Sequence, residues 1–217
     1  MPVTVIGDRA IGGFNPNQLS EALGLGVRSD PRDPAETIPL LARVLDSLER
    51  AIRQMPDDKL DWRAPDRDRP MREFTYHISR MIRSTIRGLQ TGVYETPGSA
   101  DEEGLTYNSF QGIAEFCGTV TEEYKAWASK QDIGALKTLQ PVAPDTAGVP
   151  STGAPWAAGQ RTGAERLDLI AGHSIQHLRQ VYWVLEQFGI TPKDRMADSE
   201  FPQEYVLTLI SPTGGLF

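Results

Sequence analysis

Two histidines in the C-terminal half of the chain, His173 and His177, lie four residues apart in the stretch 162–190. On an α-helix, side chains four residues apart lie one above the other, so two imidazoles at this spacing can converge on one ion. Ile170 and Val181 continue the same three-and-four spacing, which predicts that both rings face a core. Inward imidazoles must be hydrogen-bonded neutral rings or metal ligands, because a buried charge or an unpaired ring nitrogen costs several kcal/mol.

The third and last histidine of the sequence, His77, lies in a second helical pattern with Phe74, Ile78 and Met81 on its apolar face. All three histidines are therefore expected to be buried, on two helices of one bundle. Such a set predicts a facial three-histidine metal site with room for water or substrate. The alternative interpretation is three core histidines that each have a separate hydrogen-bond partner.

Other side chains that could take part in chemistry are few. Cys117 lies on an apolar helical seam with no Arg, Lys or His next to it in sequence, so we interpret it as a small buried hydrophobe. Glu165 and Asp168 precede His173 on the same predicted helix, and we interpret both as solvated charges. A metal-bound hydroxide or thiolate would need no separate general base.

The composition favours a protein that acts on small molecules. The chain has 217 residues, a formal net charge of −7 and no basic run, which disfavours nucleic acid or a membrane surface as the main partner. A single cysteine allows neither an intrachain disulfide nor a Cys-x-x-Cys pair. Neither a leader-like N-terminus nor about 18 consecutive apolar residues is present, so we expect a cytoplasmic protein.

The elements that must position the histidines are helices. Apolar residues at three-and-four spacing predict an all-α fold, an antiparallel four-helix bundle, with helices near 37–55, 70–91, 109–130 and 163–188. At the first helix, Asp33, Pro34 and Glu36 resemble a capping box, but Pro39 would clash with the carbonyl four residues back if the helix began there. Either this helix starts near Thr37, or its first turn is kinked.

The organisation outside the helices is less regular. We expect three parts: an N-terminal appendage (1–26), the bundle (27–190) and a C-terminal tail (191–217). The segment 134–161 is too long for an ordinary bundle turn, and we expect it to close over a site. Trp62, the single large aromatic residue in a charged connection, is expected to cap the bundle or to line its mouth.

The N-terminal appendage is predicted to form a β-hairpin at about 3–12 and a helix at 16–23. It resembles the C-terminal half of a glutaredoxin, with Pro2 matching the cis-proline, and Gly12, Gly13 and Phe14 matching the glycine pair and the aromatic residue that follows it. The resemblance implies backbone groups that help to hold glutathione. The Cys-x-x-Cys half is absent from this sequence, so thiol–disulfide chemistry does not carry over. Two alternatives stay open: a genuine start at Met1, or a glutaredoxin half encoded upstream. The alternative interpretation is that the appendage is a small structural addition of a hairpin and a helix.

The region from about 34 to 190 resembles the DinB/YfiT superfamily of four-helix bundles. The motifs are LDWRAPDRDRPMREFTYHI, which leads into the first histidine, and HSIQHLRQ, which matches His-x-x-x-His-x-x-Gln. The resemblance implies that His77, His173 and His177 bind a divalent metal, most often zinc or nickel, and that Gln180 is the trailing glutamine. The family often has Arg-Gly after the second histidine of the pair, where this chain has Leu178-Arg179.

The function that this resemblance implies is thiol chemistry. Characterised relatives include transferases that attach low-molecular-weight thiols to electrophiles and a mycothiol-dependent isomerase. We therefore expect a metal-dependent thiol S-transferase or a hydrolase-like enzyme that forms a homodimer. Substrate contacts are expected from Trp62, Gln180, Gly12 and Gly13. The alternative is a non-enzymatic, stress-associated module that binds a metal or a small ligand.

Overall fold

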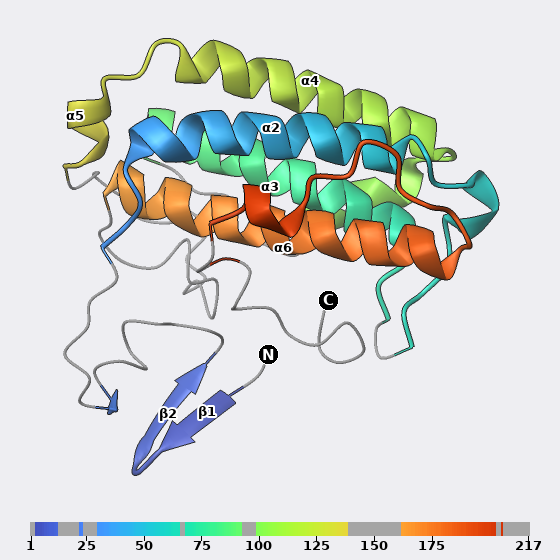
Figure 1. Ribbon diagram of the computed structural model, residues 1–217, viewed down its shortest axis with the longest axis horizontal. Coiled ribbons are helices and arrows are strands. Elements are labelled where there is room, and N and C mark those ends of the chain that lie inside the picture. Colours follow the sequence, from blue (N-terminus) through green and yellow to red (C-terminus); the bar gives the residue numbers. More distant parts are fainter. Residues whose placement is uncertain are drawn as a thin grey trace. The chain divides into compact units, whose positions relative to one another are not determined.

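The computed structural model describes residues 3–12, 22–23, 30–65, 68–92, 99–138, 162–202 and 205. Two compact units divide the chain, residues 1–32 and 33–217. The second unit is a bundle of long helices (Figure 1): α2 (Pro34–Ile52), α3 (Met71–Thr91), α4 (Phe110–Ala128) and α6 (Gly163–Gln187). The all-α bundle predicted from the seams is confirmed, and each helix boundary lies within about three residues of its prediction.

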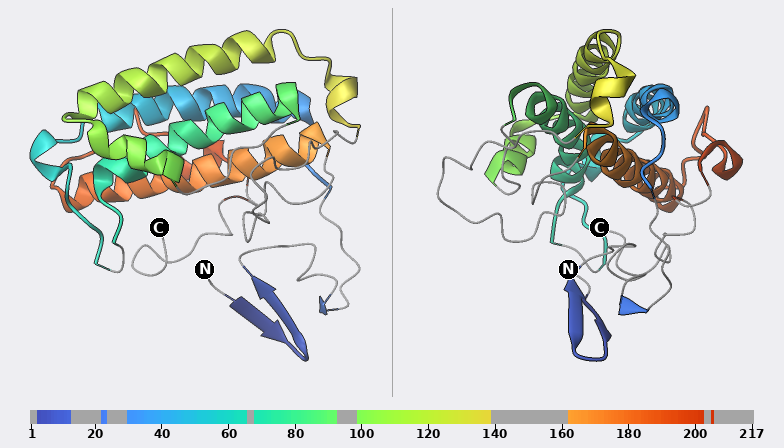
Figure 2. Two further views of the ribbon diagram at one scale, coloured as in Figure 1. Left: turned by 180° about the vertical axis from the view of Figure 1, so that it is seen from behind. Right: turned by 90° about the vertical axis from the view of Figure 1, so that its left-hand side faces the viewer.

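The bundle is not antiparallel throughout. The hydroxyl of Tyr124, near the end of α4, donates to the carbonyl of Ile38, near the start of α2, at 3.0 Å, so these two helices are antiparallel. In contrast, α3 and α4 run parallel. Tyr76 of α3 stacks on Phe116 of α4, and further along both helices Arg83 pairs with Glu123 at 2.8 Å. The helices α2 and α6 are also parallel, since both begin near the short helix α5 (Ile133–Leu136) (Figure 2).

This mixed direction follows from the connection between α3 and α4. It includes the 3₁₀-helix η2 (Ser99–Thr106), which packs against α3. A Cβ atom at Gly104 would lie 2.9 Å from Cβ of Tyr76, so η2 reaches the first turns of α3 at very close range. The chain therefore returns to the end where α3 began before it enters α4.

The start of α2 is fixed by a side-chain cap. The Asp33 carboxylate accepts a hydrogen bond from the Ala35 backbone N–H at 3.0 Å, and Pro34 occupies the first turn. The helix thus begins at Pro34, three residues before the predicted start near Thr37, and contains Pro39. A side-chain cap together with a first-turn proline is a strong start signal, and here it prevails over the cost of the internal proline.

The N-terminal unit contains a two-stranded antiparallel hairpin of β1 (Val3–Ile6) and β2 (Arg9–Gly12), in the register Val3↔Gly12. Gly7 has a φ of +57° in the turn, a conformation that favours glycine. The predicted hairpin is confirmed. The predicted helix at 16–23 falls almost wholly outside the described residues, as do Pro2, Gly13 and Phe14, so the likeness to glutaredoxin stays a prediction. In the described part of the chain, no helix combines the length and apolarity needed to cross a membrane.

Candidate metal centre

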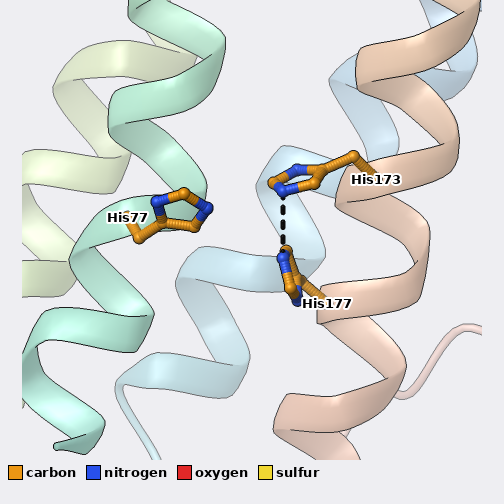
Figure 3. Close-up of side chains that lie close together, drawn as sticks. All are labelled: His77, His173 and His177. Carbon is orange, nitrogen blue, oxygen red and sulfur yellow. Dashed lines mark hydrogen bonds between the residues drawn. The ribbon is translucent and has the colours of Figure 1, made fainter. Parts of the chain in front are cut away.

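The three histidines of the sequence converge between α3 and α6 (Figure 3). The Nε2 atoms of His173 and His177 are 3.0 Å apart. One ring nitrogen from each of His77, His173 and His177 lies within 4.8 Å of the others. Three imidazoles that bind one ion at about 2.1 Å hold their nitrogens roughly 3.4 Å apart, so shifts of about 1 Å would bring this donor set to a divalent metal.

Two antiparallel helices place these rings. His77 projects from α3. The spacing of four residues on α6 places His173 beside His177, edge to face, with ring centroids 4.2 Å apart. Phe74, one turn before His77, packs edge-on against His177 at 5.1 Å between centroids. Helix packing therefore limits how far the rings can separate.

The burial of the three histidines differs from the sequence expectation. His77 is buried, with 7% of its surface exposed, as expected. His173 and His177, predicted to be buried, are partly exposed. The partial exposure does not extend to every ring atom, because Nδ1 of His173 is buried.

Gln180 fixes the orientation of one ring. Its buried side-chain amide oxygen contacts Nδ1 of His177 one turn earlier on α6. An amide oxygen can only accept a hydrogen bond, so Nδ1 of His177 carries the proton and Nε2 carries the lone pair. The Nε2–H group of His173 then donates to Nε2 of His177. Metal ligands commonly receive this kind of support from the second ring nitrogen.

The electrostatic surroundings keep the α6 histidines neutral. Burial, and then the neighbouring His77, lower the pKa of His177 from 6.5 to about 3. Burial, followed by His177 and His77, lowers the pKa of His173 well below its usual value. Arg69 contributes to both shifts and Arg80 to that of His173. Neutral imidazoles are the form that binds a metal, so proton competition at neutral pH is small.

The type of ligand atom narrows the choice of metal. Within the described residues the group consists of three imidazoles, without carboxylate or thiolate. Imidazole sites suit zinc, nickel, copper and iron better than magnesium or calcium, which prefer oxygen ligands.

The other predicted contact residues lie elsewhere. Trp62 packs edge-on against Phe188 at 5.2 Å, eleven residues beyond His177. At a rise of about 1.5 Å per residue, this is roughly 16 Å along α6, so Trp62 covers the end of the bundle. Gly12 belongs to the N-terminal unit, and Gly13 and residues 139–161 are outside the described residues.

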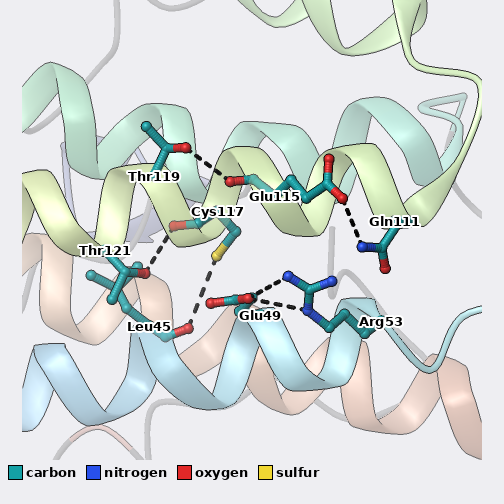
Figure 4. A network of polar contacts seen from close by, with 8 residues as sticks. All are labelled: Leu45, Glu49, Arg53, Gln111, Glu115, Cys117, Thr119 and Thr121. Carbon is teal, nitrogen blue, oxygen red and sulfur yellow. Dashed lines mark hydrogen bonds and ion pairs between the residues drawn. The ribbon is translucent and has the colours of Figure 1, made fainter.

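Cys117 takes no part in the cluster (Figure 4). It is fully buried between α4 and α2, where its thiol lies 3.9 Å from the carbonyl oxygen of Leu45. Burial raises the pKa of this thiol to about 12. The interpretation of Cys117 as a small buried hydrophobe is confirmed.

Both acidic residues that we interpreted as solvated charges have specific partners instead. Glu165 forms a reciprocal capping box with Thr162, with N–H···O distances of 2.7 and 3.0 Å. The Thr-x-x-Glu spacing was a usable signal for this cap. Asp168 accepts a hydrogen bond from the hydroxyl of Tyr205, a contact between distant residues that no local pattern predicts.

Comparison with known proteins identifies a family for this chain. No curated protein matches the chain. The profile of the DinB superfamily matches residues 40–181, which include α3, α4, most of α2 and α6, and the three converging histidines. This match covers well over half of the sequence, and with the bundle and its histidine cluster it leads to one conclusion: the chain belongs to the DinB superfamily.

Proposed function

We propose that this protein is a metal-dependent enzyme that joins a low-molecular-weight thiol to an electrophilic small molecule. The observation that supports it is the cluster of His77, His173 and His177, whose ring nitrogens lie within 4.8 Å of one another at a partly exposed position. A cluster of this kind has the donors for one divalent ion, zinc or nickel, and three protein ligands leave a coordination position for an exchangeable ligand.

The chain's own residues would prepare the site in three ways. The lowered pKa values of His173 and His177 keep both rings available as donors. Gln180 holds the His177 ring with Nε2 directed toward the other histidines. The positive charges of Arg69 and Arg80, which already disfavour protonation of His173, would also favour an anionic nucleophile over its protonated form.

A divalent ion bound at the three histidines would supply a Lewis acid that lowers the pKa of a thiol or of water. The thiol gives its proton to solvent, and its sulfur forms a bond to an electrophilic carbon. The leaving group departs with the electrons of the bond that breaks. Water in place of the thiol would give hydrolysis at the same site.

Metal analysis followed by turnover assays tests this proposal. The protein is purified without a histidine tag, and its metal content is measured for the wild type, for His173→Ala and for Glu122→Gln, an exposed control on α4. We expect about one divalent ion per chain in the wild type and in the control, and loss of the ion in His173→Ala with the helical content unchanged. Unchanged metal content in His173→Ala would contradict the proposal.

Turnover separates the enzyme from the binding module. The metal-loaded protein is mixed with cellular thiols and a chlorinated dinitroaromatic acceptor, and formation of the thioether is followed. We expect thiol-dependent turnover that is absent in His173→Ala. Stoichiometric metal binding without turnover across thiols and acceptors would support the non-enzymatic metal-binding module instead.

A further inference from the structure

The chain that follows α6 turns back and runs along that helix in the opposite direction (Figure 1). Arg195 pairs with Glu186 at 2.7 Å, and Arg179 pairs with Asp198 at 3.1 Å. Between them, the backbone N–H of Met196 donates to the hydroxyl of Tyr182 at 3.2 Å. As the segment advances from Arg195 to Asp198, its partners move back along α6 from Glu186 to Arg179. We call residues 191–202 and Tyr205 the strap.

The strap is also fixed to α2 and to Gln54, which lies just after the end of that helix. The backbone N–H of Lys193 donates to the side-chain oxygen of Gln54 at 2.7 Å, and Arg43 of α2 pairs with Glu200. Met196 and Phe201 are each 5% exposed and belong to the bundle core. Apolar anchors and polar contacts therefore hold the strap on both helices.

Tyr205, the last described residue of the strap, lies against the turn of α6 that precedes the histidine cluster. Its side chain is buried, and its hydroxyl donates to Asp168. A Cβ atom at Gly172 would lie 3.2 and 3.3 Å from two carbons of the Tyr205 ring, so the ring occupies the space that a side chain at 172 would need. Gly172 is adjacent in sequence to His173.

Considered by itself, a glycine at position 172 destabilises α6. Inside a helix, glycine is less favourable than alanine by about 1 kcal/mol. The close seat of the Tyr205 ring gives a physical reason for a residue without a side chain at position 172. Tyr205 thus contacts α6 at two residues, Asp168 and Gly172, in the turns that lead into the His173–His177 pair.

We propose that Tyr205 is a positioning residue for the metal site. By packing on Gly172 and bonding to Asp168, it holds the turn of α6 that carries His173 in register with His77. This inference rests on the proposed metal function, since the rings on α6 supply two of the three donors. Ligands held in place before the ion arrives bind it more tightly. By thermodynamic linkage, the metal must in turn stabilise the docked strap.

Cobalt titration of variants tests the role of Tyr205. Tyr205→Leu removes the ring and the hydroxyl, Tyr205→Phe removes the hydroxyl alone, and Arg43→Gln is the control, because it loosens the strap at an exposed ion pair on α2. We expect Tyr205→Leu to weaken Co²⁺ binding about 10-fold and to alter the visible spectrum of the bound ion. Tyr205→Phe keeps the ring that packs on Gly172 and should retain the wild-type spectrum. Arg43→Gln should match the wild type in both measurements.

Hydrogen exchange supplies a readout that does not depend on activity. We expect Zn²⁺ to slow amide exchange in residues 196–201 and at Tyr205 of the wild type, but not in residues 196–201 of Tyr205→Leu. Wild-type affinity and spectrum in Tyr205→Leu would overturn the inference, as would an equal effect of Arg43→Gln. If Tyr205→Leu loses its helical content, Gly172→Ala replaces it in the same measurements, because a Cβ atom at position 172 would lie 3.2 Å from the Tyr205 ring and displace it. If the wild type itself binds no Co²⁺, the proposed metal function fails first and this inference falls with it.

Discussion

The amide oxygen of Gln180 contacts Nδ1 of His177, and this single contact decides which nitrogen of His177 can bind a metal. Because Nδ1 donates to the amide, Nε2 is left with its lone pair, 3.0 Å from Nε2 of His173. Gln180 was predicted to contact substrate. In the structure its partner is a candidate metal ligand, and it is 4% exposed.

We therefore expect Gln180→Leu to weaken metal binding by about 10- to 100-fold, the usual effect of removing a partner that orients a metal ligand. Gln180→Glu keeps an acceptor for Nδ1–H and should retain most of the affinity. Competition with a chromophoric chelator measures both values. Gln187→Leu, the same change at an exposed position of α6, serves as the control. A Gln180→Leu variant with wild-type affinity would show that the contact does not orient His177.

The histidine cluster should make the metal-free protein sensitive to mild acid. Burial lowers the pKa of His177 from 6.5 to about 3. Between these two pH values, the unfolded chain binds a proton at this residue that the folded chain does not. Stability from this group is fully present above the unfolded pKa of 6.5 and is lost as pH falls from there toward the folded pKa. His173 acts in the same direction.

The test is thermal unfolding in the presence of a chelator at several pH values. The melting temperature should fall between neutral pH and about pH 4.5, a range above the titration of most carboxylates. His177→Leu should show a smaller fall over the same range, because it removes one of these titrating groups. An equal pH dependence in the wild type and in His177→Leu would mean that other groups dominate.

Cys117 should be inert in the folded protein. Its thiol is fully buried, and burial raises its pKa to about 12, so almost no thiolate forms at neutral pH. We expect mass spectrometry to detect no alkylation by iodoacetamide in native protein and complete alkylation in denaturant. Rapid labelling of the native protein would require that α4 separate from α2.

The N-terminal hairpin leads to a prediction about assembly. Val5 is 68% exposed on a two-stranded hairpin, an element that is marginal in water without further packing. We expect a homodimer whose second copy covers this surface. Light scattering should give twice the chain mass, and Val5→Lys should shift the protein toward a monomer. A wild-type monomer at micromolar concentration would contradict the prediction.

The sequence predicted the helices and the histidine cluster well, because both depend on local spacing. Three-and-four periodicity gives helix positions, and His-x-x-x-His gives two rings on one face whatever surrounds them. The same periodicity contains no information on helix direction. The parallel pairs α3–α4 and α2–α6 therefore could not be foreseen, since they depend on the long return of the chain through η2.

The strap shows a different limit of sequence reasoning. Its residues have no regular apolar period, and its anchors are pairs such as Arg179–Asp198 and Asp168–Tyr205 that are distant in sequence. The partner of Gln180, in contrast, was within reach. Residues three apart on a helix are neighbours, so the spacing of Gln180 from His177 indicated a contact between their side chains.

The capping box of α6 allows the stability of the fold to be separated from the metal site. The hydroxyl of Thr162 accepts from the Glu165 backbone N–H at 3.0 Å, and the Glu165 carboxylate accepts from the Thr162 backbone N–H at 2.7 Å. Thr162→Ala removes the first of these bonds and should destabilise the protein by about 1 kcal/mol. His173 lies eleven residues further along α6, which is about three turns. We therefore expect denaturant titration to show the loss of stability while metal affinity stays at the wild-type value. A Thr162→Ala variant that loses metal affinity without losing stability would mean that the start of α6 belongs to the site.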